Sequence, residues 1–340
     1  MPSLQIDMLP VGDSDAFLVE LVLDGSKQVI LIDGGRNWED GERILRHLDT
    51  YYGGHLDHLI LSHVDHAHAS GLVHVVEKLG GEGIGQAWVH DVSAHGVSVK
   101  RAIERASELA GAASSTAVRS VANYLRFSLQ STQDLIQALT AAGVPMAEPF
   151  ADRNNQIGPL RVLGPTEEFF EECVGFFGST EMMDRMIEQA VSFRRGRTAP
   201  TKAASPDEIL KEAIDDPETT RQASLIALLT YEGDRYLFTG DAGRRALKAV
   251  EDRDALRDVH WLKVPAHGSK HNLDPELLDL MDPALAYISS GGVDINPHPA
   301  LVSALEDRGA VVYTTSGSGN VWHRRGNVAP RSGFQTQPPR

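Results

Sequence analysis

Short apolar runs typical of buried strands alternate with helical segments in both halves of this 340-residue sequence. In the first half, residues 16–23, 28–35 and 56–63 form such runs, and residues 37–52 place their apolar side chains at helical spacing. The same alternation resumes from residue 223 onwards. Alternation of this kind predicts an α/β layered fold, with strands inside and helices outside.

Two helical stretches interrupt this alternation, at about 96–143 and 166–220. The first carries apolar residues three and four apart and ends at Gly143, as a helix that stops at a glycine does. We therefore expect one domain over residues 1–325, built from two sheets packed face to face, with the helical stretches as insertions. The Pro-, Gly- and Arg-rich tail, 326–340, is expected to be flexible.

The composition is that of a globular protein with enough apolar residues, 41%, to bury a core. No run approaches the roughly 18 apolar residues that cross a bilayer, and the N-terminus lacks a basic segment followed by an apolar one. We expect a cytoplasmic location. Lys and Arg number 32 against 47 Asp and Glu, and the resulting net charge of −15 opposes non-specific attraction to nucleic acid, although a local basic groove can outweigh it.

The single cysteine, Cys173, excludes an intramolecular disulfide and a cysteine-rich zinc cage. A metal ion in this chain would therefore be held by His and Asp. The neighbours of Cys173 are typical of a helix face, and we interpret it as a buried, inert thiol.

Polar clusters follow five of the predicted strands. Loops at strand ends are held by rigid elements yet open to solvent, so such clusters can meet at one rim of the fold. The clusters are "IDGG" at 32–35, "SHVDHAH" at 62–68, "FTGD" at 238–241, "VPAHGS" at 264–269 and "ISSGG" to "NPHP" at 288–299.

The second cluster contains side chains that suit zinc or manganese. His63 and His68 offer imidazole nitrogens and Asp65 offers carboxylate oxygens. An isolated His-x-Asp is more simply a polar surface loop. Here Asp241 and His267 follow two later strands and can complete a coordination shell, which favours a metal site.

The order of these motifs resembles the metallo-β-lactamase fold family, and within it the nuclease-like domain of bacterial DNA-uptake (competence) proteins. The family pattern has "GQGDA", "IDxG", "SHxDxDHxGGL", a Ser-rich strand leading to "TGD", then "HHGS" and a late "HP". The matching segments here are "GDSDAFL" at 12–18, "IDGG" at 32–35, "SHVDHAHASGL" at 62–72, "SLIALLTYEGDRYLFTGD" at 224–241, "VPAHGS" at 264–269 and "PHP" at 297–299.

This resemblance implies an αββα sandwich with two divalent metal ions, zinc or manganese. His63 and Asp65 would hold one ion and His68 the other. Asp241 would be the bridging carboxylate, and His267 would lie near the distal ligand position.

The resemblance also gives roles to residues around the ligands. Asp15 and Asp33 would orient ligands, whereas the plain alternative is an ordinary turn aspartate. His66 falls at a spacer position and is not expected to bind. His298 would donate a proton to the leaving group, or is simply a solvent-exposed histidine.

Two departures fall on expected catalytic positions. Ala67 stands where the family pattern has the aspartate of the second metal, and Ala266 stands where it has the first histidine of "HHGS". A methyl group cannot coordinate a cation, so metal occupancy should be reduced. We interpret the sequence as an inactivated form of an active enzyme, with a natural pseudoenzyme as the alternative. Arg221 also departs from the pattern, where the subgroup usually has Asn, and puts substrate details in doubt.

The function that the resemblance implies is metal-dependent hydrolysis by a phosphodiesterase or nuclease acting on nucleic acid or nucleotides. Hydrolysis of a small non-nucleic phosphodiester, such as one containing phosphocholine, stays open. So does a non-catalytic protein that binds a partner through the inserted helices. Cationic side chains on the insertions could contact phosphate or form a solvated surface; they are Lys100, Arg101, Arg105, Arg119, Arg126, Arg194, Arg195 and Arg197.

Overall fold

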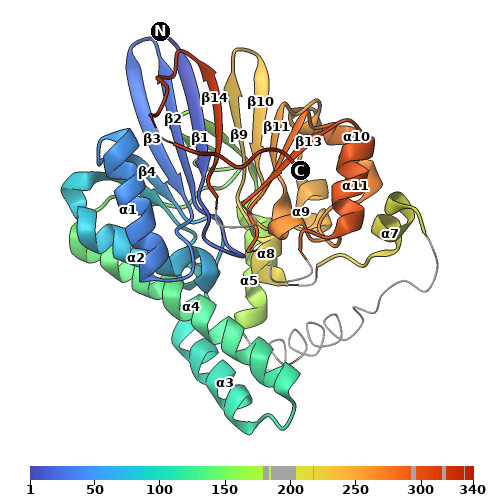
Figure 1. Cartoon of the computed structure of the whole chain (residues 1–340). Coiled ribbons are helices and arrows are strands. Elements are labelled where there is room, and N and C mark those ends of the chain that lie inside the picture. The colour runs from blue at the N-terminus through green and yellow to red at the C-terminus, as the bar shows by residue number, and fades with distance from the viewer. Residues whose placement is uncertain (179–183, 185–203, 217, 292–295, 316–318, 333) are drawn as a thin grey trace.

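Two seven-stranded sheets face each other in the computed structural model of the chain (Figure 1). The structure describes residues 1–178, 184, 204–216, 218–291, 296–315, 319–332 and 334–340. In spatial order, the first sheet contains β14 (Val321–Gly326), β1 (Ser3–Met8), β2 (Phe17–Leu23), β3 (Ser26–Ile32), β4 (Leu56–Ile60), β5 (Ile84–Trp88) and β6 (Met146–Ala147). The second contains β13 (Val311–Thr314), β12 (Leu285–Ile288), β11 (Trp261–Lys263), β10 (Asp234–Phe238), β9 (Ile226–Tyr231), β8 (Leu160–Gly164) and β7 (Gln156–Ile157).

The two sheets share one plan. In each, a run of antiparallel strands, β1 to β3 or β8 to β10, continues into parallel strands, β4 to β6 or β11 to β13. Strand β14 returns from the end of the chain and pairs antiparallel with β1. The predicted fold class, an α/β sandwich of two mixed sheets with helices outside, is confirmed.

Helices cover the outer face of each sheet because their apolar stripes need a partner. The first sheet carries α1 (Trp38–Tyr52) and α2 (His66–Leu79), and the second carries α9 (Arg244–Ala249), α10 (Pro275–Met281) and α11 (Pro299–Asp307) (Figure 1). Between the sheets, the core includes Phe17, Tyr236 and Trp261. Short 3₁₀ segments lie at η1 (Gly81–Gly83), η2 (Val92–His95), η3 (Gly175–Gly178), η4 (Arg253–Leu256) and η5 (Pro265–Gly268).

The first helical stretch forms a pair of helices that projects from the sandwich (Figure 1). Helix α3 (Val99–Ala112) packs on α4 (Thr116–Ala142), and α4 continues along α2. Gly143, where the sequence predicted the helix to end, follows α4 in the left-handed conformation, with a φ of 72°. This packing brings residues of the insertion next to the loop that follows β4.

The second helical stretch contains α5 (Glu167–Val174), α7 (Pro206–Glu212) and α8 (Thr219–Gln222). Cys173 lies on α5 and is fully buried, as predicted, and burial raises the pKa of its thiol to about 12. Arg194, Arg195 and Arg197 lie outside the described residues. Among the described helices, none has the length and apolar character to cross a membrane.

The tail beyond β14 places one arginine in a buried aromatic cage. The Arg331 guanidinium lies 4.2 Å from the ring centroid of Tyr51 and 4.4 Å from that of Trp322, and an Nη1 atom lies 2.8 Å from the Asp7 carboxylate. Asp7 is fully buried on β1. The flexibility of 326–340 stays a prediction, but this side chain is tied to the sheet.

Replacing Arg331 with Met should lower the free energy of unfolding by about 3–5 kcal/mol, because the Asp7 charge loses its main buried counter-charge. Urea unfolding measures this loss. The double variant Asp7→Asn with Arg331→Met should recover part of it, whereas Arg324→Met, at an exposed position of β14, should change stability by less than about 0.5 kcal/mol. An equal loss of stability in Arg331→Met and Arg324→Met would contradict this role of Arg331.

His90 is a buried histidine that makes no ion pair with a carboxylate among the described residues. Its ring stacks on Phe170, with centroids 4.7 Å apart, and its Nε2 donates to the carbonyl oxygen of Pro149 at 2.9 Å. Burial lowers the pKa of His90 to about 4, from 6.5 in the unfolded chain. Between these values the unfolded state binds more protons than the folded state.

We therefore expect His90 to make the protein lose up to about 3 kcal/mol of stability as the pH falls from 6.5 to 4. The variant His90→Phe should flatten the pH dependence of urea unfolding in this window. An unchanged slope in the variant would show that another group is responsible.

Candidate metal centre

The loops that follow β3, β4, β10, β11 and β12 meet at one edge of the sandwich. Parallel pairing aligns the ends of these strands, with Ile32 beside Ile60 and Lys263 beside Tyr287. The polar clusters that the sequence placed after strands therefore come together, as expected from their positions.

Three imidazoles converge on one carboxylate oxygen. The Nε2 atoms of His63, His68 and His267 lie 3.9, 4.0 and 3.7 Å from Oδ2 of Asp241. Ligands of one tetrahedral zinc ion, each at about 2 Å from it, lie roughly 3.3 Å apart. His63, His68 and Asp241 also lie within 4.8 Å of one another, which comes close to the spacing of a single coordination shell, whereas His267 shares only Asp241 with them.

The other nitrogen of each ring is held by the protein, which fixes the ring and turns Nε2 inward. The Nδ1 partners are the Ser62 hydroxyl for His63 at 2.9 Å, the Asp33 carboxylate for His68 at 2.9 Å and the Ser289 carbonyl for His267 at 3.1 Å. Nε2 of His63 is buried without a hydrogen-bond partner among the described residues. A buried donor atom in this state fits a cation at the centre.

The backbone adopts left-handed conformations at three of these positions. Asp33 has a φ of 61°, Ala266 of 46° and His267 of 55°. Residues with a Cβ pay about 1–2 kcal/mol for this conformation. Strain of this kind concentrates at functional sites, and here it turns the loop after β11 so that His267 faces Asp241.

Four buried carboxylates surround the three imidazoles. Asp15, Asp33, Asp65 and Asp241 are each at most 2% exposed, and Lys263, at 1%, is the buried ammonium among them. Its Nζ lies 2.5 Å from Asp15 and 3.4 Å from Asp241. Burial by itself raises the pKa of Asp241, but the positive charges of His267 and Lys263 outweigh it and hold that pKa well below its usual range.

The same balance governs His68. Burial lowers the pKa of its imidazole, but the charge of Asp33 and its hydrogen bond outweigh burial and raise the pKa to about 10. Metal binding and protonation at His68 therefore compete, because a ligating nitrogen must be free of its proton.

The donor atoms form overlapping groups of three, each within 4.8 Å. The groups are His63, His68 and Asp241; Asp15, Asp241 and His267; and Asp15, Asp33 and His68. Asp241, Asp15 and His68 each belong to two of them, so the three groups share residues and form one continuous cluster. Imidazole nitrogen and carboxylate oxygen suit zinc or manganese, so the residues present fit a divalent metal.

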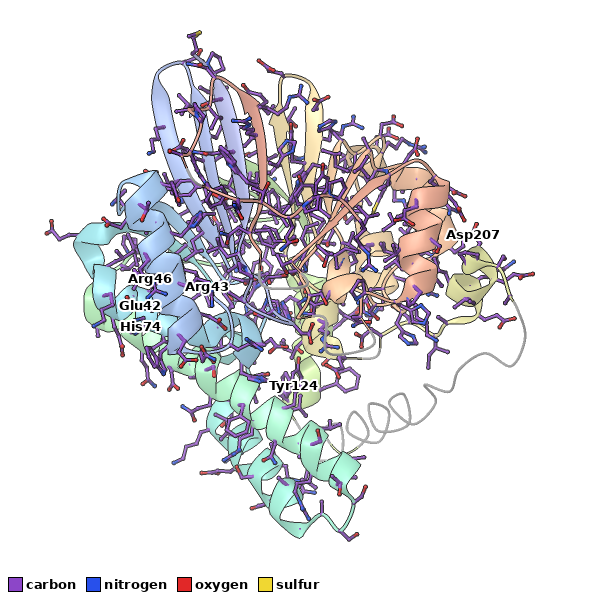
Figure 2. All side chains as sticks on the ribbon, in the orientation of Figure 1. Glu42, Arg43, Arg46, His74, Tyr124 and Asp207 are labelled. Carbon is purple, nitrogen blue, oxygen red and sulfur yellow. The ribbon has the colours of Figure 1, made fainter. Side chains whose placement is uncertain are left out.

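Asp65 lies beside these groups instead of within them. Its Oδ1 caps α2 by accepting from the Ala67 amide at 2.7 Å, and its Oδ2 accepts a hydrogen bond from the Tyr124 hydroxyl. Oδ2 is also 3.7 Å from Nε2 of His63. Tyr124 comes from the inserted helix α4, where α4 passes beneath the sandwich (Figure 2).

Arg221, like Tyr124, lies beside the candidate metal ligands although the sequence did not predict it there. Its Nε lies 3.6 Å from Oδ2 of Asp241, and its Nη1 lies 3.2 Å from Asp216 and 3.3 Å from Glu218. The departure from the family pattern at 221 therefore puts a permanent positive charge beside the candidate metal ligands.

A cavity of about 550 Å³ opens over this group of side chains. Ala67 and Ala266 both line it, so the two alanines face the same space as the candidate ligands. His66, expected to be a spacer, also lines it. The remaining lining includes Asp13, Arg36, Asp65, His68, Tyr124, Glu218, Arg221, Asp241, His267, Ser269 and Asn296.

Other predicted residues are not part of this lining. His298 caps α11, with its Nδ1 accepting from the Ala300 amide at 3.2 Å. Of the cations on the first insertion, Arg105 pairs with Asp184 and Glu108, and Arg119 donates to the Ala113 carbonyl. The described lining of the cavity contains none of the five cations of the first insertion, Lys100, Arg101, Arg105, Arg119 and Arg126.

Comparisons with known proteins add little to this geometry. No protein-family model matches the chain, and a search of curated proteins finds no match. Among solved structures, the chain is similar to a crystal structure from Thermotoga maritima described as a candidate metallo-β-lactamase. The identity is 13%, over 66% of this chain and 68% of that chain, with a TM-score of 0.30. This likeness is too weak to assign a family or an activity.

Zinc or manganese should stabilise the chain even with alanine at 67 and 266, because His63, His68 and Asp241 remain. At 100 times its dissociation constant, a ligand of the folded state contributes about 2.7 kcal/mol. Thermal unfolding with and without metal measures this shift. His63→Gln should remove it, whereas His90→Phe, a buried histidine outside the cavity, should retain it. A shift that persists in His63→Gln would place the bound ion elsewhere.

Proposed function

We propose that this chain has the architecture of a metal-dependent hydrolase of phosphodiesters, acting on nucleic acid or nucleotides. The observation that carries the proposal is the convergence of three histidine Nε2 atoms on Oδ2 of Asp241, in a buried site with an excess of carboxylates. Such a donor set is suited to divalent metals that serve hydrolysis.

The protein's own residues would prepare this site. His63, His68 and Asp241 would hold one ion, and His267 with Asp15 would contribute to a second. Bound divalent ions supply a water of lowered pKa and offset charge that develops on a phosphoryl group. Ser62, Asp33 and Ser289 fix the three rings, and Lys263 holds Asp241 and Asp15 in place.

The chain as it stands is proposed to be inactive. Ala67 and Ala266 line the cavity, where a carboxylate and an imidazole would add donors to the incomplete groups. The missing donor atoms fall at those two positions, whereas the surrounding side chains still converge as metal ligands do. We infer an inactivated enzyme with Asp at 67 and His at 266 in its active form; a natural pseudoenzyme is the alternative.

Phosphodiester substrates are favoured by the charges at the cavity. Arg36 and Arg221 both line it; Arg36 pairs with Asp40 and Arg221 with Asp216, so they provide cations at separate places for an anionic ligand. A volume of about 550 Å³ is that of a small-molecule site, which suits a nucleotide or the end of a strand. Small non-nucleic phosphodiesters fit the same space.

A non-catalytic protein that binds a partner through α3 and α4 is the second candidate. The α3–α4 pair projects from the sandwich and offers surface for such a partner (Figure 1). A cytoplasmic location is proposed alongside either function.

The double variant Ala67→Asp with Ala266→His should gain metal-dependent activity against a panel of single-stranded DNA, plasmid, RNA and a chromogenic phosphodiester. We expect an increase of at least about 100-fold over the chain as it stands, abolished by a chelator and restored by zinc or manganese.

The matched control is the same double variant with Asp241→Asn, which keeps the shape of the side chain and removes its charge. It should lose the gained activity. If the double variant binds metal yet cleaves none of these substrates, the hydrolase proposal fails and the binding protein is favoured.

A further inference from the structure

Aromatic rings from two helices meet at the rim of the cavity. His66 begins α2, and Tyr124 and Phe127 lie one turn apart on α4. The His66 ring centroid lies 5.6 Å from that of Tyr124, at 77°, and 6.2 Å from that of Phe127, at 48°. His66 and Tyr124 both line the cavity, so Phe127 adjoins it through His66.

Phe127 is exposed where its neighbours on α4 are not. Its exposed fraction is 47%, whereas Leu125 and Leu129 are 4% and 1% exposed. The side chain of His66 is 37% exposed. The Arg126 guanidinium carbon lies 4.3 Å from the Phe127 centroid, which orients the ring by a cation–π contact and leaves much of it open to solvent.

This aromatic rim adjoins the candidate ligands directly. Nδ1 of His66 lies 3.3 Å from Oδ1 of Asp65, and the Tyr124 hydroxyl donates to the other oxygen of Asp65. The Arg221 guanidinium lies 5.7 Å from the Tyr124 ring centroid and reaches Asp241 on its other side. A ligand on the rim thus has a cation between itself and the centre.

We propose that His66 and Phe127 form a subsite that stacks a nucleobase of the substrate while the attached phosphate lies near Arg221 and Asp241. The inference rests on the proposed function and names its substrate class, a nucleotide or nucleotide end. Every base offers a planar face to an aromatic side chain, so stacking needs no particular sequence. Arg126 and Arg221 flank the rim and disfavour a cationic group such as choline there.

The test compares adenosine 5′-monophosphate with ribose 5-phosphate, which lacks the base, and includes phosphocholine as a competitor that carries a cationic group. The chain as it stands is suited to this, because neither ligand needs to be cleaved. Isothermal titration in buffer with manganese should show the nucleotide binding about 5-fold or more tightly than the sugar phosphate. Phe127→Ala should make the two affinities equal and leave that of ribose 5-phosphate unchanged, and Phe127→Tyr should retain the preference.

Trp38→Ala is the matched control, since Trp38 is an exposed ring, 63% open, on α1 and outside the cavity lining. It should not alter the preference. Equal affinities in the unchanged chain, binding of neither ligand, tighter binding of phosphocholine, or a preference that survives Phe127→Ala would each overturn the subsite. If the preference follows this pattern but the double variant Ala67→Asp with Ala266→His cleaves nothing, the subsite stands and the hydrolase proposal fails.

Discussion

The arrangement of the site depends on one buried carboxylate, Asp241. Its Oδ2 is the point to which three histidines turn, and its Oδ1 lies 3.4 Å from the buried ammonium of Lys263. A buried charge persists only where opposite charges or metal ions lie beside it. The fold places such a charge beside Asp241, because β10 and β11 are parallel neighbours and bring Asp241 and Lys263 to the same edge of the sheet. The histidines follow from loops whose strands end at that edge.

The sequence predicted the parts of the site that depend on local pattern. Apolar runs marked the strands, and the polar letters after them marked His63, His68, Asp241 and His267, because a strand end fixes where a loop begins. Lys263 also left a local signal: a lysine inside the apolar run "WLKVP" must be buried or break the strand. That signal alone does not reveal its partners Asp15 and Asp241, which come from distant parts of the chain.

Tyr124, Arg221 and Phe127 were beyond such reasoning for a different reason. The roles of Tyr124 and Phe127 depend on how α4 lies along α2, and that packing is set by side chains spread over both helices. Arg221 lies on α8 and meets Asp241 only through the tertiary fold. From the helical pattern of the sequence alone, Tyr124 would be interpreted as a core aromatic residue. Only the tertiary contact with Asp65 shows that the insertion supplies a wall of the cavity. His66 was set aside because its place in the motif suggested a spacer, whereas the cavity lies on the side that this ring faces.

The pairing of β14 with β1 has a consequence for how the protein is made. β1 lies between β2 and β14, so until β14 has been synthesised one side of β1 presents unpaired backbone groups. Exposed strand edges invite pairing with other chains. Strand β14 begins at Val321, so a product terminated before that residue leaves this side of β1 open to pairing with another chain.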